Sequence, residues 1–217
     1  MKNLFNALSI IAFIIALNTL SCSSKSKKTS YETQESKYEA KEMKHEIGKI
    51  VDVSTTKDEW VQEHYIIVEG TLKDIWNYYT SSEAMRTHVA PFINVDFRNG
   101  GKWEASYNLS AKLGDSENFI NEVINVIPYR QFSTKGIRAP FDIEAMKSLR
   151  STMMFEDLGD NKIKVSAITT GWMGITDVDY RKKVFEMSGK TNPEILKCLN
   201  VRLTQGPLNW EKILNQN

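Results

Sequence analysis

The sequence contains little of what several protein classes require. It has two cysteines, five prolines and eleven glycines among 217 residues, and 28 Lys and Arg residues balance 27 Asp and Glu residues. So few cysteines exclude a disulfide-rich framework, and so few glycines and prolines exclude a collagen-like chain. Because 41% of the residues are hydrophobic and 25% are charged, a wholly disordered chain is excluded as well. The composition is that of an ordinary globular protein.

An excess of positive charge is also absent, because the formal net charge is +1. Proteins that bind nucleic acid need clustered Lys and Arg residues against the phosphates, so we expect no nucleic-acid partner. Histidines are few as well, namely His45, His64 and His88. Since metal sites need several His, Cys or carboxylate ligands close together, we expect no bound metal and no cofactor. The sequence has no P-loop and no G-x-S-x-G nucleophile motif.

The N-terminus has the parts of an export signal. Lys2 precedes an apolar run over residues 4–17, and small residues then lead to Cys22. The most apolar part, residues 10–17, is too short to cross the roughly 30 Å core of a bilayer. We therefore predict a secretory signal peptide over residues 1–21. The alternative is an uncleaved membrane anchor formed by the same apolar run.

The end of this signal, Leu20-Ser21-Cys22, resembles a bacterial lipobox, in which the cysteine is diacylated and becomes the mature N-terminus. Thr19 stands where that motif usually has leucine. Each buried methylene contributes about 0.8 kcal/mol, so several acyl chains such as palmitate anchor a protein stably. We predict a lipid on Cys22, attachment to a membrane of the bacterial cell envelope, and a folded domain that is periplasmic or extracellular.

Residues 22–50 have a composition unlike that of the rest. They are rich in Ser, Lys, Glu and Thr and hold few large apolar side chains. Such a segment cannot bury enough surface to offset its ordering entropy, so we predict a disordered tether. Residues 51–217 are then one domain. With Cys22 assigned to lipid, Cys198 has no partner for an intramolecular disulfide, and we expect it to be a small buried hydrophobic side chain.

The domain begins with a strand and two short helices. Residues 60–68 are rich in Val, Ile, Tyr and Trp, which favours a strand. Leu72, Ile75, Trp76 and Tyr79 then recur at the spacing of one helical face. Residues 82–88 predict a second helix. Further strands are predicted in a hairpin over 95–107 with a type I′ turn at Asn99-Gly100, then over 119–127 and 129–134, and in a last hairpin of 151–158 and 162–172 around Gly159-Asp160-Asn161.

The C-terminal region predicts a helix. Asn192 suits the N-cap position and Pro193 the first helical position. Ile195, Leu196, Leu199 and Leu203 form an apolar stripe, and Gly206-Pro207 ends it. A short last helical turn follows around Trp210. The predicted fold class is therefore α+β, with a curved antiparallel sheet wrapped around a long C-terminal helix and a ligand cavity between them.

Several segments, in this order, resemble one known family. Residues 72–76 are similar to its x-E-x-V-W helix, and 96–103 (D-F-R-N-G-G-K-W) to its D-x-R-x-G-G-x-W hairpin. Residues 121–128 are similar to its G-x-V-x-E-I-x-P strand, and Gly171-Trp172 with 206–210 to a subgroup's ending. The family is the SRPBCC or START-like superfamily, in the branch of homologues of the heat-shock protein 90 ATPase activator. The resemblance implies a helix-grip fold with a deep hydrophobic cavity. It does not imply chaperone activation, because an exported domain would not meet cytosolic heat-shock protein 90.

Aromatic and other apolar side chains are the best candidates for a ligand site. We expect them to face the concave side of the sheet or the helix that covers it, with Tyr hydroxyls and indole N–H groups as orienting polar points. The candidates are Trp76, Tyr79, His88, Trp103, Tyr107, Phe119, Met153, Phe155, Trp172 and Leu199. The alternative for each of them is ordinary core packing.

Three functions remain open at this point. The first is a monomeric, membrane-anchored module that binds a small hydrophobic ligand. The second is a protein-interaction domain related to chaperone or envelope-stress work. The third is a cyclase- or hydratase-type enzyme, which would place His88 or a carboxylate inside the cavity with a perturbed pKa. The carboxylates considered for that role are Glu104, Glu122, Asp142 and Glu144, but their spacing does not assign a catalytic residue.

Overall fold

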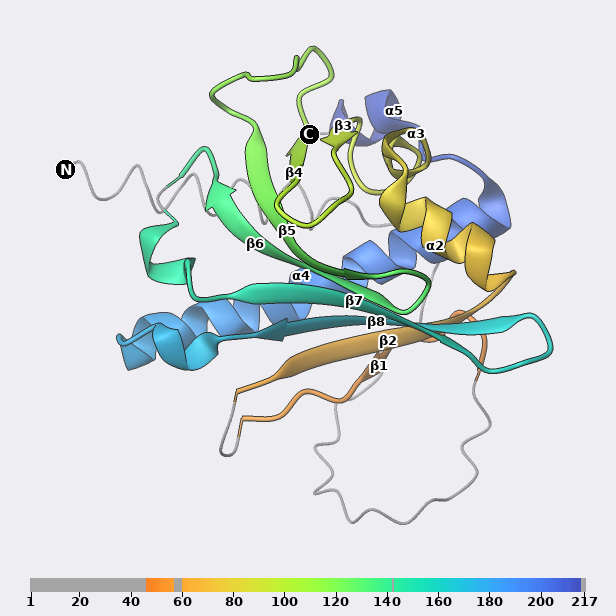
Figure 1. The fold of residues 1–217 in the computed structure, drawn as a ribbon, viewed down its shortest axis with the longest axis horizontal. Helices are drawn as coiled ribbons and strands as arrows, with labels where there is room; N and C mark the ends of the chain where they lie inside the picture. Colours follow the sequence, from red (N-terminus) through yellow and green to blue (C-terminus); the bar gives the residue numbers. More distant parts are fainter. Residues whose placement is uncertain (1–45, 57–59, 142, 216–217) are drawn as a thin grey trace.

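A computed structural model describes residues 46–56, 60–141 and 143–215 as a curved antiparallel sheet with a long C-terminal helix (Figure 1). In these ranges the sheet has eight strands in the order β1-β2-β8-β7-β6-β5-β4-β3. The elements are β1 (Val51–Asp52), β2 (Gln62–Glu69), α2 (Leu72–Thr80), α3 (Ser82–Arg86), β3 (Phe92–Val95), β4 (Lys102–Ser106), β5 (Phe119–Ile127), β6 (Gln131–Arg138), η1 (Glu144–Met146), β7 (Arg150–Asp157), β8 (Lys162–Thr170), η2 (Trp172–Gly174), α4 (Val178–Gln205) and α5 (Trp210–Leu214). The α+β helix-grip architecture predicted from the sequence is confirmed.

Helix α2 forms where its apolar spacing predicts it. The hydroxyl of Thr71 accepts a hydrogen bond from Asp74 N and donates one to the Asp74 carboxylate, which caps the first turn. Ile75, Trp76 and Tyr79 are buried, so one face of the helix packs onto the sheet, against β7. Helix α3 follows directly and ends at Arg86, two residues before the predicted end.

The predicted type I′ turn at Asn99-Gly100 is wrong. Strands β3 and β4 do pair, but β3 ends at Val95 and β4 begins at Lys102, and of the two turn residues only Gly100 has a positive φ, of 77°. A Cβ on Gly101 would lie 2.0 Å from the carbonyl oxygen of Asp96. The six-residue connection therefore folds tightly on itself. It also exchanges backbone hydrogen bonds with Val123 of β5, which a two-residue turn could not reach.

The other predicted hairpin is confirmed. Asp160 and Asn161 have φ values of 50° and 57°, in the left-handed region that turns of this kind require. Strands β7 and β8 pair along their whole length, from Arg150 opposite Thr170 to Asp157 opposite Ile163. The short turn at 159–161 thus places the two strands in this antiparallel register.

The predicted start of the C-terminal helix is wrong, because α4 begins fifteen residues earlier and carries Pro193 inside it. Asp177 is its N-cap, and the carboxylate accepts hydrogen bonds from the first-turn N–H groups of Asp179 and Tyr180. Asn192 does not cap a helix. Its side-chain amide instead donates to Gln62 Oε1 on β2 (3.1 Å) and to the Thr169 hydroxyl on β8 (3.2 Å).

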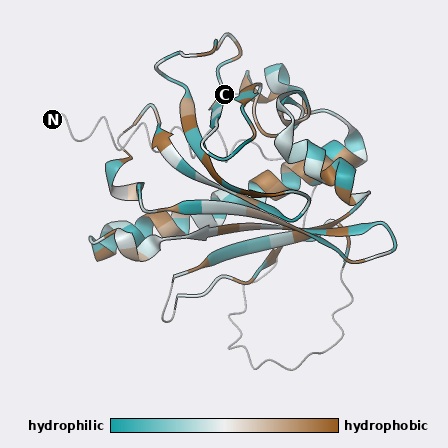
Figure 2. Ribbon diagram, in the orientation of Figure 1, coloured by the Kyte–Doolittle hydropathy of each residue, from teal (hydrophilic) through white to brown (hydrophobic). Residues whose placement is uncertain are grey.

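The main core lies between the sheet and helices α2 and α4. Ile66, Trp76, Phe132, Phe155 and Leu199 belong to one buried cluster that joins all three. Burial of each such side chain contributes about 1.5–3 kcal/mol. Figure 2 shows hydrophobic and hydrophilic residues interspersed along α4 and the strands, as elements with one buried face require.

The last part of the predicted tether contacts the domain. Gly48 N donates to the carbonyl oxygen of Ile67 (2.8 Å), and Ile50 packs against the main core. The predicted signal peptide and Cys22 lie outside the described residues. Within residues 46–56, 60–141 and 143–215, we find no helix of the length and hydropathy needed to span a bilayer.

Candidate functional site

An aromatic cluster fills the space between α2 and the sheet. We use this name for Trp76, Tyr79, Phe97, Phe132 and Phe155. The Trp76 ring lies 5.8 Å from Phe97, 6.1 Å from Phe132 and 5.2 Å from Phe155 between centroids, each time nearly perpendicular. Such edge-to-face contacts are favourable beyond the area they bury. The sheet, α2 and the loop before β4 thus share one apolar wall.

Most of the sequence-predicted site residues lie in or beside this cluster. Those in the same core are Trp76, Tyr79, Trp103, Met153, Phe155 and Leu199. The His88 ring is 5.3 Å from the Tyr79 ring. Tyr107 packs near Cys198 and Trp210 in a neighbouring group. The spacing of apolar residues in the sequence cannot distinguish residues that line a pocket from residues that only pack in the core. Ligand binding by these residues therefore stays a prediction.

Two of the predicted residues lie elsewhere. Phe119 stacks edge-on with Phe141, and Trp172 packs with Phe185 at 4.9 Å between ring centroids. Phe97 and Phe132 belong to the aromatic cluster but were not among the predicted ligand contacts. Phe132 is the one large apolar residue of 131–134 and lies within the predicted strand over 129–134, which could have identified it as a core residue. Phe97 belongs to the alternating apolar residues of the predicted 95–107 hairpin, but it lies in the irregular connection between β3 and β4, and only tertiary contacts decide that its ring joins the cluster.

Two buried polar atoms in this region have no hydrogen-bond partner among the described residues. They are the hydroxyl oxygen of Tyr79 and Nε2 of His88. Both side chains are 1% exposed. Buried polar atoms are nearly always bonded, because an unpaired one costs about 1–3 kcal/mol. Among the described residues, these two atoms are therefore polar groups still available for hydrogen bonding beside an otherwise apolar wall.

His88 is held in its neutral form. Burial is the largest cause that lowers its pKa, to about 4, and the nearby Arg202 charge lowers it further. The Nδ1 atom lies 3.3 Å from the Ala84 carbonyl oxygen, so Nδ1 is the protonated nitrogen and Nε2 is an acceptor. Burial raises the pKa of the Tyr79 hydroxyl, which is therefore neutral and can donate.

The carboxylates considered for catalysis do not form one group. Buried Glu104 accepts hydrogen bonds from Gly114 N and the Asn118 amide, both at 2.6 Å. Glu122 pairs with Lys135, and Glu144 has its own ion pair with Lys147. Asp142 lies outside the described residues. Over the described ranges, there is also no group of three or more His, Cys, Asp or Glu side chains that could hold a metal ion.

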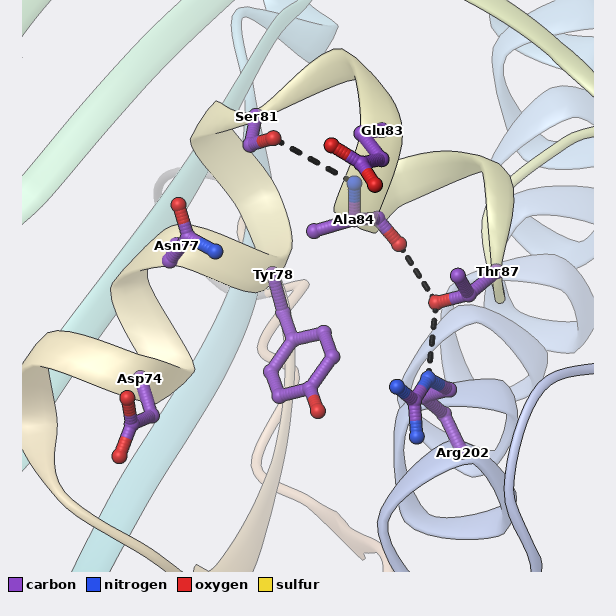
Figure 3. A pocket seen from close by; sticks show the side chains of 8 residues that line it. All are labelled: Asp74, Asn77, Tyr78, Ser81, Glu83, Ala84, Thr87 and Arg202. Carbon is purple, nitrogen blue, oxygen red and sulfur yellow. Dashed lines mark hydrogen bonds between the residues drawn. The ribbon is translucent and has the colours of Figure 1, made fainter.

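A separate recess of about 380 Å³, which we call the outer recess, lies where α2, α3 and the end of α4 meet (Figure 3). Its lining residues are Asp74, Asn77, Tyr78, Ser81, Glu83, Ala84, Thr87 and Arg202. Tyr78 faces this recess, whereas the next residue, Tyr79, is buried in the aromatic cluster. The lining is polar and charged, unlike that cluster.

The fold and the aromatic cluster define a protein of the helix-grip class. Solved structures agree at the level of fold. The crystal structure of protein Ms6760 from Mycobacterium smegmatis matches with a TM-score of 0.51 at 14% identity, over 72% of this chain and 98% of that chain. A crystal structure of a protein from Rhodobacter sphaeroides matches with a TM-score of 0.52 at 13% identity, over 71% and 98%.

The solution structure of the Aha1 dimer from Colwellia psychrerythraea is a weaker match, with a TM-score of 0.45 at 14% identity over 67% of this chain and 97% of that chain. No protein-family model and no curated protein matches the sequence. At identities this low, structural similarity shows a shared fold and leaves function to the site.

Proposed function

We propose that the domain belongs to the SRPBCC or START-like superfamily and binds a small, mostly apolar molecule between the sheet and helices α2 and α4. The order of the family-like segments in the sequence supports the first part, together with the shared helix-grip fold. The single observation that carries the second part is a pair of buried polar atoms beside the aromatic cluster, Tyr79 Oη and His88 Nε2, that have no hydrogen-bond partner among the described residues.

These two atoms specify the polar part of the ligand. Nε2 of neutral His88 accepts a hydrogen bond, and the Tyr79 hydroxyl can donate one. A hydroxyl group on an apolar molecule meets both needs, since it donates to His88 and accepts from Tyr79. A ligand carboxylate fits less well, because an anion has no proton for Nε2 and neither side chain is charged. We therefore expect a neutral ligand with a hydroxyl group.

Entry of the ligand requires side-chain movement. The Tyr79 hydroxyl oxygen and His88 Nε2 are shielded from solvent, and the Phe155 ring contacts the rings of both Trp76 and Tyr79. A ligand must therefore displace or rotate aromatic side chains, and the released contacts are replaced by contacts to the ligand. Such remodelling reduces affinity by the free energy of opening the site.

Native mass spectrometry of the full chain tests this proposal. The expected result is an added mass, beyond any acyl chains on Cys22, that organic solvent releases. Tyr79→Phe should lower the retained fraction. Phe119→Leu is the matched control and should leave it unchanged, because Phe119 packs outside the aromatic cluster. A bare chain in repeated preparations would contradict the proposal.

We further propose attachment to a membrane of the bacterial cell envelope through a lipid on Cys22, on the strength of the predicted export signal and tether. A lipid anchor supplies membrane affinity without a spanning helix, since several acyl chains together bind a bilayer stably. The domain would then lie outside the cytoplasm, within reach of apolar molecules in or near that membrane.

A protein-interaction domain is the second candidate function, and one loop favours it. Between β4 and β5, Leu109 is 49% exposed and Leu113 is 65% exposed. Buried Glu104 holds the loop through Gly114 N, and Arg138 donates to the Asp115 carbonyl oxygen (2.6 Å). A fixed loop that presents leucines to solvent suits contact with a partner.

Site-specific photo-crosslinking tests that second function. A photoreactive amino acid at position 113 of the full chain should give a discrete cross-linked protein band in intact cells. The same amino acid at position 73, on the exposed side of α2, is the control and should give none. Equal cross-linking from both positions would argue against a docking role for the loop.

A further inference from the structure

Charges of opposite sign share the outer recess without pairing. Arg202 lies on α4, whereas Asp74 and Glu83 lie on α2 and α3 (Figure 3). Across the part of the chain that the structure describes, no ion pair within 4.0 Å involves any of these three side chains. These charges lie on different walls of the recess and do not neutralise each other. A ligand that carries both a positive and a negative group can therefore bind to both walls.

Arg202 is held in place with part of its guanidinium available. Its Nε donates to the Thr87 hydroxyl (2.9 Å), and that hydroxyl donates to the Ala84 carbonyl oxygen (2.6 Å). The guanidinium carbon lies 5.1 Å over the Tyr78 ring, in a cation–π contact. The two terminal nitrogens make no hydrogen bond to the described residues. Such a pair of donors matches the two oxygens of a carboxylate.

The carboxylates of Asp74 and Glu83, which line the recess, favour a positively charged group on the ligand. One oxygen of Asp74 accepts the Thr71 hydroxyl, which orients the carboxylate, and Glu83 is exposed at the start of α3. A simple anion on Arg202 would be repelled by two nearby carboxylates, and a simple cation would be repelled by Arg202. A molecule with both charges avoids both penalties.

We propose that the outer recess binds a small zwitterion of the α-amino acid type, with its carboxylate on Arg202 and its ammonium group toward Glu83, while Asp74 adds negative charge to the same lining. Tyr78 and Ala84 line the same recess and provide apolar surface for the side chain of the amino acid. A volume of about 380 Å³ is within the range of small-molecule sites. The site is distinct from the aromatic cluster, so it stands whether or not an apolar ligand binds there.

Three matched probes separate the possibilities: L-phenylalanine, 3-phenylpropionate without the ammonium group, and 2-phenylethylamine without the carboxylate. NMR titrations of the full chain should show saturable shifts of the Ala84 and Thr87 amide signals with L-phenylalanine. Each singly charged analogue should bind about tenfold more weakly or worse, as expected when a charged hydrogen-bonded contact is lost.

Substitutions then show which side chain of the recess binds which charged group of the ligand. Arg202→Gln should weaken L-phenylalanine binding about tenfold or more and leave 2-phenylethylamine binding unchanged or tighter. Glu83→Gln, at an exposed position, should weaken binding of L-phenylalanine and 2-phenylethylamine and leave 3-phenylpropionate binding unchanged or tighter. Arg98→Gln, outside the recess and paired with Asp96, is the control and should change nothing. Equal binding of all three probes, no saturable shift, or an unaffected Arg202→Gln variant would each overturn the proposal.

Discussion

At the scale of single residues, the buried hydroxyl of Tyr79 differs from that of Tyr107 in one respect. The Tyr107 hydroxyl donates to the Val89 carbonyl oxygen (3.1 Å), whereas the Tyr79 hydroxyl has no partner among the described residues. Tyr79 is buried and Tyr107 is half-buried as a whole residue, and burial raises the pKa of both hydroxyls. Comparing substitutions of these two tyrosines therefore measures how much free energy of unfolding an unpaired buried hydroxyl removes.

We expect Tyr79→Phe to raise the free energy of unfolding of the ligand-free protein by about 1 kcal/mol, because it removes an unsatisfied polar atom without a change of shape. Tyr107→Phe should lower it by about 1 kcal/mol, because the Val89 carbonyl loses its donor. Urea denaturation with unchanged m-values measures both. Equal destabilisation by the two substitutions would mean that Tyr79 has a partner after all.

His88 makes stability depend on pH. Its pKa is about 6.5 when unfolded and about 4 when folded, so the unfolded chain binds more protons between these values. The contribution of neutral His88 is therefore complete above about pH 6.5 and is lost as the pH falls toward 4. The shift corresponds to about 3 kcal/mol.

We expect the free energy of unfolding of the wild-type protein to fall by about that amount between pH 6.5 and pH 4, beyond the loss shared with His88→Gln. Denaturation curves over this range measure the difference between the two proteins. If both proteins have the same slope against pH, then His88 is not buried in its neutral form.

At the scale of elements, α4 continues through Pro193, a residue that normally ends or kinks a helix. A proline inside a helix removes one hydrogen bond and costs about 3 kcal/mol relative to alanine. The helix nevertheless continues through Pro193, because it packs on β2 and β8, and Leu196 and Leu199 beyond the proline are buried in the main core. Hydrogen bonds from Asn192 to the sheet hold the same turn.

We expect Pro193→Ala to stabilise the protein by up to about 3 kcal/mol, since alanine restores the backbone donor. Asn192→Ala should destabilise it by about 1 kcal/mol, through loss of the bonds to Gln62 and Thr169. Thermal unfolding followed by circular dichroism measures both variants. Destabilisation by Pro193→Ala would show that the proline shapes the helix to fit the sheet.

At the scale of the whole molecule, the prediction concerns location. Wild-type protein should sediment with membranes, and Cys22→Ala should appear in the soluble exported fraction or retain its signal peptide, because it lacks the acyl acceptor. Fractionation followed by immunoblotting measures this, and Cys198→Ala is the matched control, since Cys198 is buried in the domain. A Cys22→Ala protein that stays in the membrane fraction at its processed size would contradict lipid anchoring.

The sequence by itself determined the elements whose signals are local. The strand predicted over 119–127 matches β5 and that over 162–172 contains β8, the helical spacing around Trp76 predicted α2, and the residues at 159–161 predicted a turn, because strands, helix faces and turns each depend on near neighbours. The helix-grip class followed from the order of these elements.

The tertiary structure alone decided the features that join distant parts of the chain. Gln62 and Asn192 are 130 residues apart, yet their hydrogen bond helps to keep α4 intact across Pro193. The polar atoms of Tyr79 and His88 that lack a partner in the described part of the chain, and the opposed charges of the outer recess, likewise depend on how α2, α3 and α4 pack. A sequence pattern reports which face of an element is apolar, whereas packing between elements decides which polar groups on those faces find partners.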